Sequence, residues 1–168
     1  MIPFAAYGQV PARLIMKRKI MSYRIFFLGG YDLEMQTIRE LLDKLRIDYV
    51  DKKLGWNNAL LSEYRDILDE YAGKPDCTIY GIELKEDVPP PSNYVRIDHH
   101  NDFIDRPSSI EQVLSVLNIT DRHQQLVGAN DARYIPGMLA LGATRQEVDE
   151  IRFHHIGLRW DVRSVTPP

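Results

Sequence analysis

The sequence predicts an α/β domain with a mainly parallel β-sheet flanked by helices. Short apolar runs, rich in branched and aromatic residues, alternate with segments whose apolar residues recur at helical spacing. Strands that alternate with helices favour βαβ crossovers, in which successive strands run parallel. The length of 168 residues suits one domain, and 44% hydrophobic with 27% charged residues is typical of globular proteins.

Four short runs are predicted to be buried strands. Their branched and aromatic side chains suit a pleated, half-buried surface. Gly29 and Gly30 close the first run, Glu83 follows the third, and Asp98 follows the fourth. The predicted strands cover residues 23–28, 48–50, 77–82 and 95–97.

Helices are predicted between these strands and after the last of them. Asp32 opens the first helix, and Asn57 or Asn58 is expected to cap the second. Capping boxes that begin at Ser108 and Thr144 predict two further helix starts. Two more helical stretches are expected over about residues 121–129 and 136–141.

The folded domain is expected to cover residues 21–152. In the segment 1–20 the basic residues follow the apolar part, which is the wrong order for a secretory signal. We expect that segment to be a disordered extension, because Met21 restarts the chain just before a strand. Helical periodicity fails from Phe153 onward, so residues 153–168 are expected to form an irregular tail, and its His154 and His155 are interpreted as stray histidines rather than ligands.

Composition restricts the compartment and the partners. The formal net charge of −3 makes long nucleic acid an unexpected ligand, because such binding needs clustered Lys and Arg. The single cysteine, Cys77, allows no intrachain disulfide, which favours a reducing, cytoplasmic location. No apolar segment approaches the roughly 20 residues that span a bilayer, so no membrane partner is expected.

An acid and two imidazoles, Asp98, His99 and His100, follow the fourth predicted strand without a gap. Ligand sites of open α/β sheets lie at the carboxyl ends of the strands. Carboxylates and imidazoles both offer lone pairs to a divalent metal at neutral pH. A polar loop whose histidines merely bond to the backbone is the alternative interpretation.

Four further acids share this placement near strand ends or helix junctions. They are Asp32, Glu34, Glu83 and Asp131. If they converge at one edge of a parallel sheet, their charges repel unless a cation neutralises them, which favours one or two divalent ions. Taken singly, each is an ordinary loop acid or helix cap, and the first two also suit a helix N-terminus.

With these motifs the segment from Tyr23 to Arg152 resembles the DHH phosphoesterase superfamily, which is named for its Asp-His-His motif. That motif is present here as Asp98, His99 and His100. The resemblance implies that Asp32 and Glu34 form the first motif, Glu83 the second and Asp131 the fourth. It also implies a DHH-phosphoesterase-like fold for the domain at 21–152.

The resemblance further implies a role for each residue. Asp32 would bind a first manganese ion, Glu34 a second, and Glu83 would bridge the two. His99 and Asp131 would complete the second site. Asp98 would orient an imidazole, and His100 would contact the scissile phosphate or assist the leaving group.

The chain departs from the family pattern at named positions. Glu34 and Glu83 stand where the family has aspartates, and the family's first-motif histidine is missing from the stretch Leu28-Gly29-Gly30. No Gly-Gly-His signature of the family's C-terminal substrate-binding domain occurs in the sequence.

The expected function is that of a metal-dependent phosphoesterase using one or two Mn²⁺ or Mg²⁺ ions. A divalent-metal-activated water would hydrolyse a phosphodiester or phosphoanhydride in a small nucleotide or short oligonucleotide. The chain is compatible with a homodimer. One alternative is a degenerate, non-catalytic domain that binds a nucleotide or a metal, with a regulatory or assembly role. Another is a structural α/β domain whose strand-end acids coincide by chance.

Overall fold

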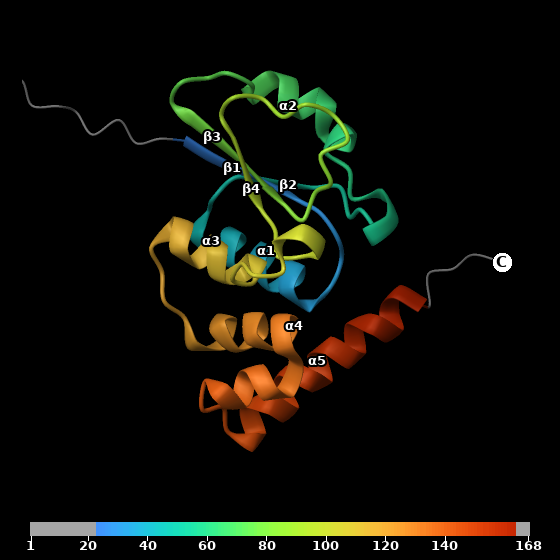
Figure 1. Cartoon of the computed structure of the whole chain (residues 1–168), viewed down its shortest axis with the longest axis vertical. Helices are drawn as coiled ribbons and strands as arrows, with labels where there is room; N and C mark the ends of the chain where they lie inside the picture. Colours follow the sequence, from blue (N-terminus) through green and yellow to red (C-terminus); the bar gives the residue numbers. More distant parts are fainter. Residues whose placement is uncertain (1–22, 164–168) are drawn as a thin grey trace, which may run out of the picture.

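A four-stranded, wholly parallel sheet forms the centre of the protein (Figure 1). The structure is a computed structural model that describes residues 23–163, so the predicted extension 1–20 lies outside the described residues. The strand order is β2-β1-β3-β4. The strands are β1 (Tyr23–Leu28), β2 (Tyr49–Asp51), β3 (Cys77–Ile82) and β4 (Tyr94–Ile97). The predicted α/β class with a parallel sheet is therefore confirmed.

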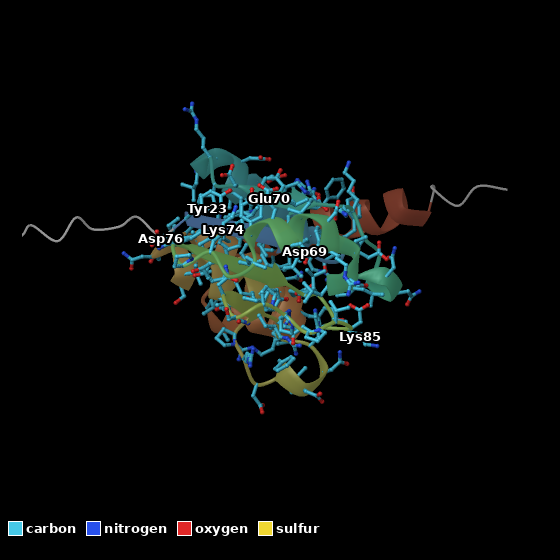
Figure 2. All side chains as sticks on the ribbon, turned by 90° about the horizontal axis from the view of Figure 1, so that it is seen from above. Tyr23, Asp69, Glu70, Lys74, Asp76 and Lys85 are labelled. Carbon is cyan, nitrogen blue, oxygen red and sulfur yellow. The ribbon has the colours of Figure 1, made fainter. Side chains whose placement is uncertain are left out.

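The carboxyl ends of three neighbouring strands are aligned. Leu28 of β1 pairs with Ile82 of β3, and Ile82 pairs with Ile97 of β4. The residues that follow these strands therefore leave the sheet at the same edge. Figure 2 labels both edges: Tyr23 and Asp76 mark the amino-terminal edge, and Lys85 lies beyond the carboxyl end of β3.

Helices cover both faces of the sheet. On one face, α1 (Leu33–Leu45) and α3 (Ser109–Leu117) bury apolar side chains against the strands. On the other face, α2 (Arg65–Tyr71) and the segment before it do the same (Figure 1). Alternation along β1 explains both cores, since Phe26 and Leu28 face one helix layer while Ile25 and Phe27 face the other.

Two further helices form a layer outside α1 and α3. They are α4 (Arg122–Ala140) and α5 (Arg145–Arg163). Leu33, at the start of α1, packs with Leu126 and Val127 of α4 and with Ile151 of α5. This apolar cluster holds α4 beside the beginning of α1. No helix in residues 23–163 is both long and apolar enough to cross a membrane.

The second helix begins later than the sequence predicts. Two 3₁₀ turns, at Trp56–Asn58 and Leu61–Tyr64, precede α2, and neither Asn57 nor Asn58 caps it. Tyr64 is fully buried, donates its hydroxyl proton to the Leu28 carbonyl and accepts from the backbone N–H of Lys52. These long-range contacts fix the segment in a shape that local helix signals do not reveal.

The C-terminal helices also differ from the expectation. The two stretches expected at 121–129 and 136–141 form one element, α4, interrupted at Tyr134 (φ 55°, ψ −150°), so Asp131 lies before the break. Helix α5 continues to Arg163, so the irregular tail expected from Phe153 is wrong over residues 153–163. The segment 153–163 contains no proline, and helical hydrogen bonds need no regular apolar face.

Candidate metal centre

Three carboxylates from distant parts of the chain approach one imidazole nitrogen. His99 follows β4 and is 4% exposed. Its Nε2 atom lies 3.3 Å from Glu34 Oε2, 3.5 Å from Glu83 Oε1 and 3.0 Å from Asp131 Oδ2. The first turn of α1, the end of β3 and the middle of α4 therefore meet at the carboxyl edge of the sheet.

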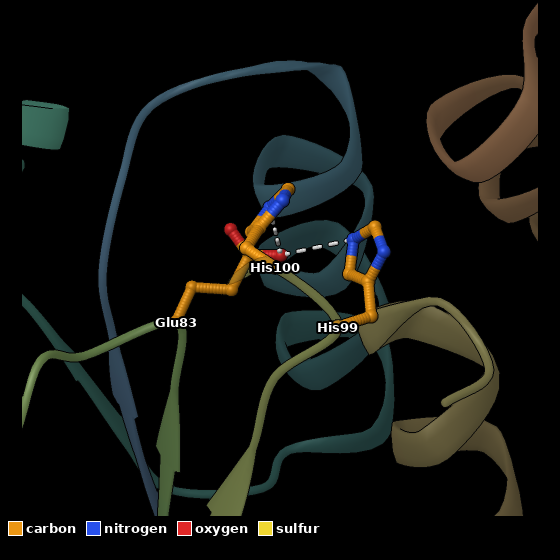
Figure 3. A group of neighbouring side chains, drawn as sticks. All are labelled: Glu83, His99 and His100. Atoms are coloured by element: carbon orange, nitrogen blue, oxygen red, sulfur yellow. Dashed lines mark ion pairs between the residues drawn. The ribbon is translucent and has the colours of Figure 1, made fainter. Parts of the chain in front are cut away.

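The second imidazole reaches the same carboxylate. His100 Nε2 lies 3.3 Å from Glu83 Oε1, and the two histidine rings are 4.2 Å apart between centroids. Figure 3 shows both imidazoles pointing toward the Glu83 carboxylate. His99 is buried, whereas the side chain of His100 is 35% exposed. One histidine thus lies inside the cluster and the other at its open side.

Glu83 has an unusual backbone conformation at the end of β3. Glu83 has a φ of 52°, a left-handed conformation that costs a non-glycine residue roughly 1–2 kcal/mol. Its N–H donates to the Ile97 carbonyl at 2.9 Å, which ties the end of β3 to β4. A Cβ on Gly29 would lie 2.6 Å from the Glu83 carbonyl oxygen, so only glycine lets the two segments approach this closely.

Glu34 is positioned by the N-terminus of α3. Its Oε1 accepts a 2.9 Å hydrogen bond from the backbone N–H of Ile110, which leaves Oε2 facing His99. Ser108 and Glu111 form the predicted capping box that fixes this helix start. A free N–H at the positive end of a helix stabilises a buried carboxylate.

The surroundings in the site shift the pKa values of its carboxylic acids in opposite directions. Burial, and next the charge of Glu83, raise the pKa of Asp32 to about 7. Burial is also the main cause that raises the pKa of Glu34 well above its usual value, against the contact with His99. Burial alone would raise the pKa of Glu83, but its contacts with His100 and His99 lower it to about 2.

Both imidazoles favour the charged form in the absence of a cation. Burial would lower the pKa of His99, but its contacts with Asp131, Glu34 and Glu83 raise it to about 12. The contact with Glu83 is the main cause that raises the pKa of His100. The protein therefore balances several clustered carboxylates with positive charge.

The donor set fits a divalent cation. Two groups of three residues each present ligand atoms within 4.8 Å of one another: Glu34 with His99 and Asp131, and Glu83 with His99 and His100. Buried side-chain atoms of these residues lack any hydrogen bond of good geometry. They are Glu34 Oε2, both carboxylate oxygens of Glu83, His99 Nε2 and His100 Nε2. Proteins rarely leave buried polar atoms unpaired, and a cation bound between these atoms would give their lone pairs a partner.

Two predicted site residues make other contacts. Asp32 is the N-cap of α1, and its Oδ1 accepts a 2.8 Å hydrogen bond from the N–H of Met35. It belongs to neither group of ligand atoms. The Asp98 carboxylate accepts from the backbone N–H of His100 at 2.9 Å, rather than from an imidazole as the resemblance implied. Asp98 therefore shapes the backbone between the strand and the histidines.

Two residues beside the cluster, Trp56 and Ser109, are not among the site residues predicted from the sequence. The ring of Trp56 lies 5.2 Å from that of His100 at an interplanar angle of 90°, and no local pattern in the sequence marks this residue. Ser109 is fully buried and contacts Glu83.

His154 is exposed on α5, where its Nδ1 lies 2.8 Å from the Glu150 carbonyl oxygen, and it belongs to neither group of ligand atoms. The side chain of His155 is not described.

Comparison of the chain with models of protein families, with curated proteins and with solved structures finds no significant match.

Proposed function

We propose that the cluster around His99 binds one or two divalent cations, Mn²⁺ or Mg²⁺, and that the protein hydrolyses a phosphodiester or phosphoanhydride. The substrate would be a small nucleotide or a short oligonucleotide. The single observation that carries the proposal is the convergence of buried, unpaired donor atoms from Glu34, Glu83 and His99, with the Asp131 carboxylate 3.0 Å from the same imidazole nitrogen. Burying several carboxylates together is unfavourable unless a positive charge compensates them.

Each residue has a distinct part in this proposal. Glu34, His99 and Asp131 would hold one ion, and Glu83 lies between them and His100. When bound, a divalent cation would lower the pKa of a water molecule and neutralise charge on the phosphate. His100, partly exposed at the open side, would contact a phosphate oxygen or give a proton to the leaving group.

The resemblance to the DHH phosphoesterases supports the same assignment. The group of Glu34, His99 and Asp131 corresponds to the second metal site that the resemblance implies, with Glu83 beside it. The resemblance is carried by the motifs alone, because the comparisons with known proteins give no match. Membership of that superfamily is therefore part of the proposal.

Hydrolysis assays test the proposal directly. We expect Mn²⁺-stimulated hydrolysis of bis(p-nitrophenyl) phosphate and of short oligonucleotides by the wild type. His99→Ala and Asp131→Ala should each lower the rate by about 100-fold or more, because removing an inward-facing ligand weakens metal binding.

Matched surface variants serve as controls in that assay. His123→Ala removes an exposed histidine of α4, and Asp69→Ala removes an exposed aspartate of α2, labelled in Figure 2. Both should retain wild-type rates. Absence of hydrolysis, or equal rates in the His99 and control variants, would refute the enzymatic function.

A second function has one specific observation in its favour. Asp32 caps its own helix and lies outside both ligand groups, and the stretch before it has no histidine. A first metal ion would therefore have few protein ligands. The alternative is a non-catalytic domain that binds a nucleotide or one metal ion. Elemental analysis showing one bound ion per chain, together with no turnover of either substrate, would favour it.

A further inference from the structure

We propose that Trp56 forms a stacking subsite for a planar aromatic ring attached to the phosphate ester that the metal centre acts on. The inference deepens the proposed function and rests on it for the position of the phosphate. It assigns a substrate-selecting role to a residue outside the metal cluster.

An open cavity connects Trp56 with the metal centre. It has a volume of about 900 Å³, which is ample for a nucleotide-sized ligand. Glu83 and His100 line it at the metal end, and Trp56, Lys85, Arg96 and Phe103 form other parts of its wall. A ligand in this cavity can therefore touch His100 and Trp56 at once.

Trp56 is held in place yet remains open to solvent. Its ring contacts the ring of His100 edge to face, with centroids 5.2 Å apart. The far end of the indole lies close to Gly30, since a Cβ built there would be 3.4 Å from the indole Cη2 atom. Even so, 52% of the residue is exposed. A large aromatic side chain fixed on two sides and exposed beside a polar centre is typical of ligand-binding surfaces.

Charges in the cavity indicate where the phosphate lies. The Arg96 guanidinium is paired with Glu86 at 2.6 Å and packs over Phe103, so it is already neutralised. Among the described residues, Lys85 is exposed and makes no ion pair. The remaining charged groups of the wall are mostly acidic. A phosphate therefore belongs beside the cation-binding end, with Lys85 as the free cation of the wall.

The ring and the phosphate together define the ligand class. A phosphate at His100 and a ring on the adjoining indole require a phosphate ester that carries a planar heterocycle, of which a nucleotide is the common biological form. Stacking tolerates different bases, because every base has a π-face. The subsite should therefore distinguish nucleotides from phosphorylated sugars more strongly than one base from another.

Binding measurements separate the contribution of the aromatic ring to affinity from that of the phosphate. The chain has two tryptophans, so Trp160→Phe leaves Trp56 as the single reporter of fluorescence. In the presence of Mg²⁺, AMP should quench this fluorescence, and ribose 5-phosphate should leave it unchanged. By calorimetry on the wild type, AMP should bind about tenfold or more tightly than ribose 5-phosphate, in line with base stacking on an aromatic side chain.

Substitutions of Trp56 complete the test. Trp56→Leu should remove the preference for AMP over ribose 5-phosphate without lowering the affinity for ribose 5-phosphate. Trp56→Phe should restore part of that preference. Phe153→Leu changes an aromatic residue that is 77% exposed and outside the cavity, and should bind both compounds as the wild type does. Since Trp56 is half-exposed, all variants should melt close to the wild-type temperature.

The outcomes distinguish this inference from the proposed function. If the protein hydrolyses phosphodiesters but AMP and ribose 5-phosphate bind equally, the subsite is refuted and the hydrolase stands. If AMP binding depends on Trp56 but metal-dependent hydrolysis is absent, the subsite stands and the hydrolase falls. Failure of AMP to bind at all would overturn the subsite.

Discussion

The Nε2 atom of His99 lies 3.0 Å from Oδ2 of Asp131, which joins the end of β4 to the middle of α4. Most of the cluster lies on the sheet and its first covering layer, but Asp131 comes from the outer helical layer. The apolar packing of Leu126 and Val127 against Leu33 holds α4 in this position. Helix α4 is therefore part of the site rather than an appendage to it.

Metal binding should stabilise the fold. We expect Mn²⁺ at about one hundred times its Kd to stabilise the protein by about 2.7 kcal/mol. The protein is first freed of metal with EDTA. Thermal melts with and without added Mn²⁺ then measure the metal-induced shift in melting temperature. Glu34→Gln should remove most of it, because the amide keeps the shape but loses the charge. Asp69→Asn, on the surface of α2, should keep the full shift. An equal shift in both variants would place the ion elsewhere.

The metal-free protein should lose a specific stabilisation as the pH rises. The folded pKa of His99, about 12, lies above the value of about 6.5 in an unfolded chain. Charged His99 therefore stabilises the fold fully below about pH 6.5, and this contribution declines as the pH rises toward the folded value.

Comparison with His99→Gln isolates that contribution. The difference in melting temperature between wild type and variant should shrink steadily from about pH 6.5 to about pH 9 in EDTA. With Mn²⁺ the trend in the wild type reverses, because His99 must release its proton to bind the ion, so the metal-induced shift grows with pH. A difference that does not change with pH would contradict the assigned charge of His99.

Gly29→Ala should damage both the fold and the site. The new Cβ would lie 2.6 Å from the Glu83 carbonyl oxygen and 2.9 Å from that of Ile82, and backbone atoms cannot move aside without shifting the end of β3. We expect a loss of about 1–3 kcal/mol in the free energy of unfolding. Metal affinity, measured by calorimetry, should fall by about tenfold.

Gly55→Ala provides the matched control for this change. A Cβ at Gly55 meets only the Asn58 side chain, at 3.4 Å, and its φ of −77° suits alanine. Stability and metal affinity should both stay close to wild type. If Gly55→Ala and Gly29→Ala weaken metal binding equally, the close approach at Gly29 does not position Glu83.

Two equivalent capping boxes allow stability to be separated from the site. Ser108 caps α3 next to the Ile110 N–H that binds Glu34, whereas Thr144 caps α5 at the surface. Alanine at either position should cost about 1 kcal/mol of stability, measured by urea unfolding. Only Ser108→Ala should also weaken metal binding, because fraying of α3 moves the Ile110 donor away from Glu34.

Most of the fold could be predicted from the sequence because strand and helix signals are local. The runs that form β1 and β3 were located with their exact ends, and the capping boxes at Ser108 and Thr144 begin helices as expected. The segment before α2 was predicted wrongly. There, burial of Leu61 and Tyr64 decides the backbone conformation, and no local pattern encodes that contact.

The sequence by itself determined that acids and imidazoles follow the ends of predicted parallel strands, because the alternation of strands and helices favours a parallel sheet whose carboxyl ends share an edge. Only the tertiary structure decided which acids meet. Asp32 and Glu34 are two residues apart, yet the first uses its carboxylate to cap α1, while the second points inward to His99. Docking of α4 brought Asp131 to the cluster, and the 3₁₀ turn Trp56–Asn58 placed Trp56 beside His100. Such convergence depends on long-range packing, which residue spacing along the chain does not specify.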